Sequence, residues 1–143
     1  MAEFKFSAES QPLEKLYTKV DMEGHELFSD QPESNGGSDR QACPVSIMVA
    51  SIAACESMIT RKLSEKMRLN IKNHRIAVDA YIPEGYEKDG RGIEKLHISY
   101  IFDSEEPDEK LEKLVANMAK LCPIVNSINT KANITHEIKR QSL

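Results

Sequence analysis

The stretch from Cys43 to Met58 constrains the fold of this chain most strongly. It reads CPVSIMVASIAACESM, and no charged residue occurs between Val45 and Cys55. The rest of the chain is well charged, since Asp, Glu, Lys and Arg make up 29% of its 143 residues. A helix that is apolar on every face belongs in an interior. We therefore expect this helix to cross the centre of an assembly, with Cys55 either packed inertly or kept from water for chemistry.

Length and composition indicate a single soluble domain. A chain of 143 residues can bury one core, so we expect one domain over residues 1–143. The net charge of −4 disfavours nonspecific binding to nucleic acid or to an anionic membrane. No apolar run approaches the roughly 18 residues of a membrane span, and no signal peptide is evident at the N-terminus. We therefore expect a cytoplasmic protein with reduced thiols and with neither a nucleic acid nor a membrane as partner.

Alternating apolar and polar residues predict antiparallel strands. A short strand is expected at 4–8, followed by a hairpin at 16–28 with its turn at Glu23-Gly24. A second hairpin is expected from strands at 74–82 and 96–102, joined by a polar loop. Between the hairpins, Pro44 suits the first turn of a helix that ends near Met67. The order of strands, helix and strands favours an α+β fold with antiparallel sheets around a long buried helix.

Two features surround these elements. The loop from Asp30 to Gln41 contains Gly36-Gly37 but lacks the Gly-Lys-Ser/Thr ending of a phosphate-binding loop, so we interpret it as a flexible link. A second helix is expected to start at Pro107 and to carry an apolar stripe through Cys122. Pro123 interrupts it, and a short helix at 124–129 and a last strand at 133–138 follow.

The cysteines are the candidate chemical groups. Cys55 has small neighbours, but a buried cysteine is most often inert packing. Cys122 precedes Pro123 and can cap the next helix, where the helix N-terminus would lower the pKa of its thiol. A core cysteine at a kink is an equally good interpretation. Cys43 is interpreted as a loop residue at the mouth of the first helix.

Other kinds of site are not supported by the sequence. The histidines lack metal-ligand spacing, and the three cysteines contain no CxxC pair, so we expect no metal site. A G-x-S-x-G elbow of hydrolases is also missing. His136 shares the apolar face of its strand and is interpreted as structural. Glu56 follows Cys55, but adjacent helical residues point about 100° apart, so it need not touch the thiol.

Taken together, these residues resemble the OsmC/Ohr family of thiol-dependent peroxidases, and more closely its OsmC-like branch. The matching segments are Gly24-His25-Glu26-Leu27, Gly36-Gly37, Ala53-Ala54-Cys55, Cys122-Pro123-Ile124-Val125 and Asn133-Ile134-Thr135-His136-Glu137. The resemblance implies an OsmC-like fold built as an intertwined homodimer. In that fold two long helices cross at the centre, sheets from both subunits wrap them, and the active sites lie at the dimer interface.

The resemblance also implies a chemistry. The family cysteine that matches Cys55 attacks a hydroperoxide and becomes a sulfenic acid, and the cysteine that matches Cys122 resolves it to a disulfide. An organic hydroperoxide as substrate, an external dithiol or lipoyl-type reductant and no bound cofactor are therefore expected. Well-characterised members carry a glutamate where this chain has Val45, and an arginine from the preceding loops. Arg40 is the only arginine before Cys55.

Three hypotheses follow from these residues. The first is an oxidative-stress peroxidase with Cys55 peroxidatic, Cys122 resolving and Arg40 stabilising the thiolate. The second keeps the fold but makes the protein a non-catalytic or redox-responsive dimer that holds a small apolar ligand in its inter-subunit pocket, which Val45 favours. The third is a structural dimer with inert thiols.

Overall fold

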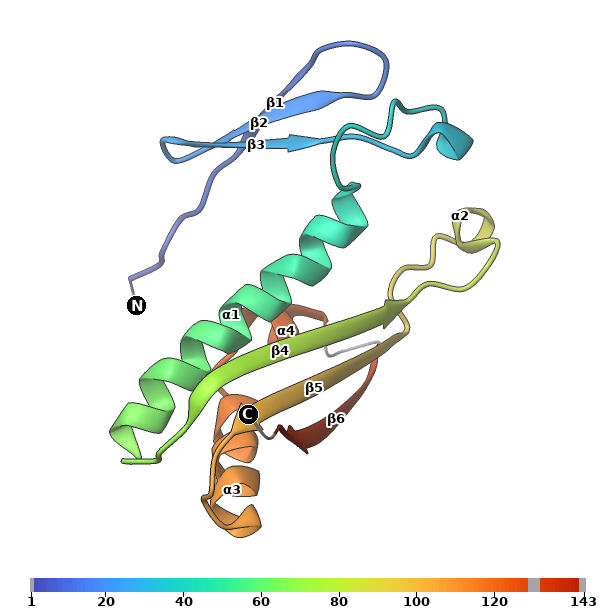
Figure 1. Cartoon of the computed structure of the whole chain (residues 1–143). Coiled ribbons are helices and arrows are strands. Elements are labelled where there is room, and N and C mark those ends of the chain that lie inside the picture. The colour runs from blue at the N-terminus through green and yellow to red at the C-terminus, as the bar shows by residue number, and fades with distance from the viewer. Residues whose placement is uncertain (1, 129–131, 142–143) are drawn as a thin grey trace. The chain divides into compact units, whose positions relative to one another are not determined.

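The computed structural model describes residues 2–128 and 132–141, and it confirms a mixed α+β fold (Figure 1). The chain divides into two compact units, Met1–Met48 and Val49–Leu143. Each unit, so far as it is described, contains a three-stranded sheet. That the whole chain forms a single domain stays a prediction.

The first unit contains an antiparallel meander of β1 (Glu9–Pro12), β2 (Thr18–Met22) and β3 (His25–Ser29). The predicted hairpin is confirmed, with Val20 opposite Leu27. Glu23 and Gly24 have φ values of 49° and 90°, the positive values that a two-residue hairpin turn needs to match the twist of its strands. The strand predicted at 4–8 is wrong, because the first strand begins at Glu9.

The loop after β3 is held in place by Asp30, so the prediction of a flexible link is wrong. Asp30 is 1% exposed, and its carboxylate accepts the backbone N–H groups of Gln31 at 2.8 Å and Arg40 at 3.1 Å. Burial alone would raise the pKa of Asp30, but these donors hold it below its ordinary value. The short 3₁₀ helix η1 (Glu33–Asn35) and Gly37 complete the loop.

The second unit contains a sheet in the order β4-β5-β6, formed by β4 (Lys72–Tyr81), β5 (Lys95–Asp103) and β6 (Asn133–Arg140). The predicted β4–β5 hairpin is confirmed as antiparallel. β6 pairs with β5 in parallel, with Ile98 opposite His136, so the expectation of purely antiparallel sheets is wrong for this pair. The chain between the two strands passes through helices, the long crossover that a parallel pair requires (Figure 1).

Four α-helices occur in the described residues: α1 (Pro44–Lys66), α2 (Tyr86–Asp89), α3 (Asp108–Met118) and α4 (Pro123–Ile128). The bounds of α1 agree with the prediction. α3 ends at Met118, so the predicted continuation to Cys122 is wrong. Pro123 disfavours helical conformation at Cys122, the residue directly before it. The predicted short helix at 124–129 corresponds to α4, except that residue 129 lies outside the described residues.

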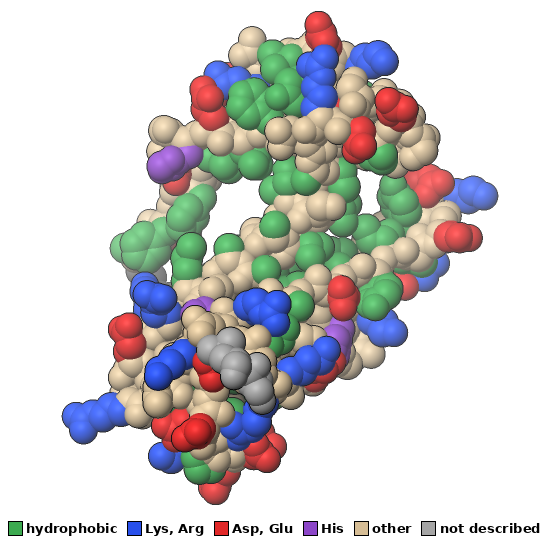
Figure 2. Space-filling model, in the orientation of Figure 1, with side chains coloured by type: hydrophobic (Ala, Val, Ile, Leu, Met, Phe, Trp, Pro, Cys, Tyr) green, Lys and Arg blue, Asp and Glu red, His purple; other side chains and the backbone are tan. Residues whose placement is uncertain are grey.

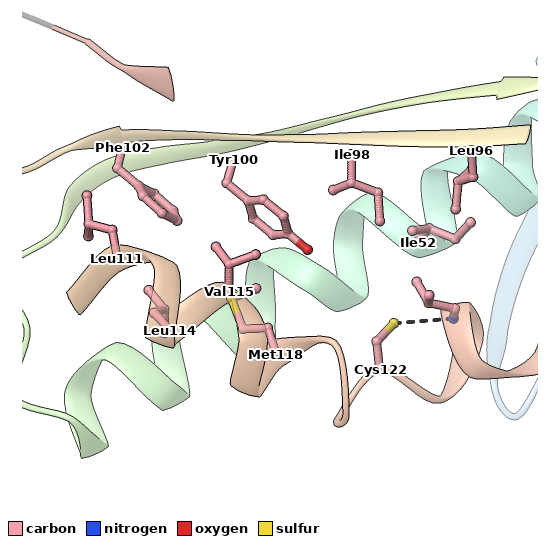
Figure 3. Close-up of a cluster of buried hydrophobic side chains, with 11 residues drawn as sticks. Ile52, Leu96, Ile98, Tyr100, Phe102, Leu111, Leu114, Val115, Met118 and Cys122 are labelled. Atoms are coloured by element: carbon pink, nitrogen blue, oxygen red, sulfur yellow. Dashed lines mark hydrogen bonds between the residues drawn. The ribbon is translucent and has the colours of Figure 1, made fainter. Parts of the chain in front are cut away.

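The core of the second unit lies where the inward side chains of β5 meet those of α1, α3 and α4 (Figure 3). Its fully buried strand residues alternate along β5 and comprise Leu96, Ile98, Tyr100 and Phe102. Helix α1 buries one stripe, Ile52, Glu56, Thr60 and Ser64, while Met58 is 66% exposed. The residues of the stripe are four apart and therefore share one helix face. In the single chain α1 is thus covered on one face, and coverage of the others by a second subunit stays a prediction.

The surface carries mixed charge. On the face shown in Figure 2, basic and acidic side chains are interspersed. Within the described residues, no helix has both the length and the apolar character needed to cross a membrane.

Candidate active site

The second unit brings together Cys55, Glu56, Tyr100 and Cys122, from α1, β5 and the residue before α4. Cys55 packs against the buried apolar cluster to which Cys122 and Tyr100 belong. The Tyr100 hydroxyl donates a hydrogen bond to Oε2 of Glu56 at 3.2 Å. The side chains of Cys55 and Glu56 lie close enough to Cys122 to raise its pKa. All three cysteines of the chain are free thiols. The fold thus gathers two cysteines that are 67 positions apart in the printed sequence.

Cys122 is fully buried and weakly acidic. Its exposure is 0%, and the Val125 N–H donates to its sulfur at 3.5 Å (Figure 3). Burial raises the pKa of the thiol to about 12; Cys55 and Glu56 add to this effect, and the Val125 N–H opposes it. The expectation that a helix N-terminus would lower this pKa is wrong, because desolvation of the thiolate outweighs one backbone donor.

Glu56, which was not predicted to belong to a site, is a buried carboxyl group. Its side chain has 0% exposure, and its Oε1 has no hydrogen-bond partner in the described part of the chain. Burial raises the pKa of Glu56, while the Tyr100 hydrogen bond and the nearby Cys122 thiol oppose the increase. Burial and the neighbouring Glu56 charge likewise raise the pKa of Tyr100, so its hydroxyl keeps its proton.

A signal for Glu56 was present in the sequence. It is the first acidic residue in the long helix, and it lies four positions from both Ile52 and Thr60. Those two residues form the buried stripe with it. An acid on the face that a helix packs inward is rarely left there without a partner or a role.

Arg40 lies in the first unit, where its charge is already paired. Its Nη2 lies 2.9 Å from Oε2 of Glu14, and its guanidinium stands 5.0 Å from the centre of the Tyr17 ring. Its backbone N–H binds Asp30. The predicted role of Arg40 as stabiliser of a thiolate stays a prediction.

Cys43 caps helix α1. Its carbonyl oxygen accepts the Ile47 N–H at 3.0 Å, and its sulfur lies 3.4 Å from the Ser46 hydroxyl oxygen. The hydrogen bonds with Ser46 lower the pKa of the Cys43 thiol. Cys43 is therefore a more acidic thiol than an ordinary cysteine, and it will compete for thiol reagents.

The histidines make structural contacts. Nε2 of His74 lies 2.8 Å from the Ser57 hydroxyl oxygen, and the His136 ring stacks on Tyr100 with centroids 6.0 Å apart. Within residues 2–128 and 132–141, no group of three or more His, Cys, Asp and Glu side chains could hold a metal ion.

Comparison with known proteins identifies the family. The family model described as OsmC-like protein matches residues 36–137. No curated protein matches the chain. Among solved structures, an OsmC-like protein from Mycoplasma pneumoniae has a TM-score of 0.87 at 12% identity, covering 99% of this chain and 100% of that one.

Two further solved structures share the fold. An organic hydroperoxide resistance protein from Elizabethkingia anophelis has a TM-score of 0.80 at 15% identity, covering 98% of this chain and 99% of that one. The organic hydroperoxide resistance protein OsmC from Legionella pneumophila has a TM-score of 0.74 at 16% identity, covering 97% and 99%. At these identities the structures show the fold, whereas the sequence match over most of the chain shows descent. The chain belongs to the OsmC-like family.

Proposed function

We propose that this protein is a cysteine-dependent peroxidase that reduces organic hydroperoxides, with Cys55 peroxidatic and Cys122 resolving. The observation that carries the proposal is the placement of Cys55 and Cys122 in one apolar cluster, where the first influences the pKa of the second. Two similar folds carry names that refer to organic hydroperoxide resistance, which supports the substrate class. Apolar surroundings favour an organic hydroperoxide over hydrogen peroxide.

The reaction balances with an external reductant. The Cys55 thiolate attacks the outer oxygen of the hydroperoxide, the O–O bond breaks, and the alkoxide takes a proton and leaves as an alcohol. The Cys55 sulfur is oxidised to a sulfenic acid. The Cys122 sulfur then attacks the Cys55 sulfur, forming a disulfide and releasing water. A dithiol or lipoyl-type reductant returns two electrons and two protons, and no bound cofactor is required.

The proposal also includes the oligomeric state of the active enzyme and the role of Arg40. The active form is a homodimer, consistent with the uncovered apolar residues of α1. Arg40, which pairs with Glu14 in the single chain, is the proposed stabiliser of the Cys55 thiolate. Arg40→Ala is then expected to slow attack on the hydroperoxide without affecting disulfide formation.

Cysteine variants test the catalytic roles. Because Cys43 is an acidic competing thiol, each variant is made in a Cys43→Ser background, which itself should retain activity. Cys55→Ser is expected to abolish consumption of cumene hydroperoxide with dithiothreitol or dihydrolipoamide. Cys122→Ser should instead accumulate a Cys55 sulfenic acid that dimedone traps. If the parent protein consumes no cumene or lipid hydroperoxide with either reductant, the proposal is wrong.

Val45 favours a second candidate function. It stands where characterised members of the family carry a glutamate, and it is 43% exposed at the start of α1. An apolar residue there suits a dimer that binds a small apolar ligand. Native mass spectrometry that finds a co-purified lipid-like molecule, together with a Cys55 that no hydroperoxide oxidises, would support this candidate over the peroxidase.

A further inference from the structure

The resolving step has a proton problem at Cys122. A thiolate, not a thiol, attacks sulfur, and burial raises the pKa of Cys122 to about 12. At neutral pH such a thiol keeps its proton. The side chain has 0% exposure, so bulk water has poor access to its proton. A peroxidase that relies on Cys122 therefore needs a base inside the protein.

Glu56 is placed to accept this proton. Its carboxyl group is fully buried beside Cys122, and each group alters the pKa of the other. The Tyr100 hydroxyl occupies Oε2 at 3.2 Å, whereas Oε1 has no partner in the described residues. The hydrogen bond from Tyr100 fixes the orientation of the carboxyl group through one oxygen. The other oxygen stays free to accept a proton.

Of the titratable groups in this cluster, Glu56 is the one suited to act as a base. The titratable side chains that face it are Tyr100 from β5 and Cys122 before α4. Cys55, the preceding residue on the same helix, acts on Cys122. Tyr100 keeps its proton because burial and Glu56 raise its pKa. Burial also raises the pKa of Glu56, which makes its carboxylate a stronger base than that of an exposed glutamate.

We propose that Glu56 is the general base of the resolving step. The inference rests on the peroxidase function proposed above. The Glu56 carboxylate removes the proton from the Cys122 sulfur as that sulfur attacks the Cys55 sulfenic acid. The S–S bond forms, the S–O bond breaks, and the departing hydroxide takes the proton back from Glu56 and leaves as water. The carboxylate is regenerated, and the hydroperoxide remains the only oxidant.

Single-turnover kinetics test this assignment with Glu56→Gln in the Cys43→Ser background. One equivalent of cumene hydroperoxide is mixed with reduced protein, and sulfenic acid and disulfide are quantified separately by quenched-flow mass spectrometry. The variant should form the sulfenic acid within a few-fold of the parent rate. Disulfide formation should slow by about 100-fold or more, the usual contribution of a positioned base.

The pH profile of disulfide formation separates a base from a structural residue. In the parent the rate should rise as Glu56 ionises and then level off. In Glu56→Gln it should rise about tenfold per pH unit from pH 6 to 9, because ionisation by solvent hydroxide then limits the step. Tyr100→Phe removes a hydrogen bond that opposes the raised pKa of Glu56, so the midpoint of the parent profile should move to higher pH.

Each remaining outcome is decisive. If Glu56→Gln forms the disulfide at the parent rate with the parent pH profile, the inference is wrong and the peroxidase proposal stands. Equal slowing of sulfenic acid and disulfide formation marks a structural role and also overturns the inference. If Glu56→Gln does not fold, an unshifted profile in Tyr100→Phe overturns it. A parent protein that forms no sulfenic acid at all contradicts the peroxidase proposal, and with it the inference.

Discussion

Gly37 is a residue at which the absence of a side chain is a packing requirement. A Cβ atom there would lie 1.9 Å from the carbonyl oxygen of Gln31 and 2.8 Å from Oδ1 of Asp30. Backbone cannot give way as a flexible side chain can, so Gly37→Ala must displace the chain that surrounds the buried Asp30 carboxylate. We expect a loss of folding free energy on the order of 2 kcal/mol, measured as a lower midpoint in urea denaturation.

Gly92 provides the matched control for this substitution. A Cβ atom at Gly92 would meet nothing within 4 Å. Gly92→Ala should therefore leave the urea midpoint unchanged or slightly raised, since alanine reduces the freedom of the unfolded chain. Equal midpoints for the two variants would show that the loop around Asp30 relaxes freely, contrary to its description as a fixed segment.

The sequence indicated which residue types belong to the candidate site better than it indicated how buried or charged their surroundings are. Cys55 and Cys122 were candidates because their types and surroundings resembled a family pattern. Glu56 was set aside, because adjacency on a helix said nothing about which neighbours the fold would bring to it. The pKa of Cys122 was expected to fall and instead rises, because the sign depends on burial that only packing determines.

Among the elements, β6 is the strand whose attachment is most open to test. Among the described strands it lies at the edge of the sheet, where its one neighbour is β5. His97 on β5 joins it through both ring nitrogens: Nδ1 lies 2.6 Å from the Thr135 hydroxyl oxygen and Nε2 lies 2.6 Å from Oε2 of Glu137. The hydrogen bond from His97 is the main cause that holds the pKa of Glu137 below its ordinary value.

His97→Ala should therefore loosen β6 selectively. Native-state hydrogen exchange is expected to show a several-fold loss of protection in the amides of β6, while those of β4, on the opposite side of β5, serve as the internal control. Because the folded-state pKa of Glu137 is lowered, the pairing stabilises above the ordinary carboxyl range and is lost as pH falls through the lowered value. The difference between variant and parent should narrow on acidification. Unchanged protection of β6 at neutral pH would contradict this role.

The type and extent of most elements were predictable, whereas one strand direction was not. Alternation and helical periodicity are local, and they placed α1, β4 and β5 within about two residues of their observed bounds. The direction of β6 depends on the course of the chain through α3 and α4, which no local pattern encodes. The end of α3 at Met118 was missed because the apolar stripe continues beyond it to Cys122.

For the whole molecule, the open question is what covers the outer side of α1. The single chain leaves apolar side chains uncovered in the second unit: Met58 is 66% exposed, and Leu121 is 54% exposed. An 11-residue stretch without charge, from Val45 to Cys55, is more apolar than a single-chain surface needs. The resemblance to the OsmC/Ohr family implies that a second copy of the chain packs against this helix.

Analytical ultracentrifugation of the parent and of two Met58 variants tests whether the protein is a homodimer. The parent should sediment with about twice the chain mass of 16.1 kDa. Met58→Glu places a charge in the expected interface, where desolvation without a partner is costly, and should shift the protein to monomer. Met58→Leu keeps the apolar surface and should remain dimeric.

Because Cys55 lies on the same helix, the monomeric variant should also lose peroxidase turnover if the site is completed by the second subunit. A monomeric parent would exclude the dimer, and a dimeric Met58→Glu would place the interface elsewhere.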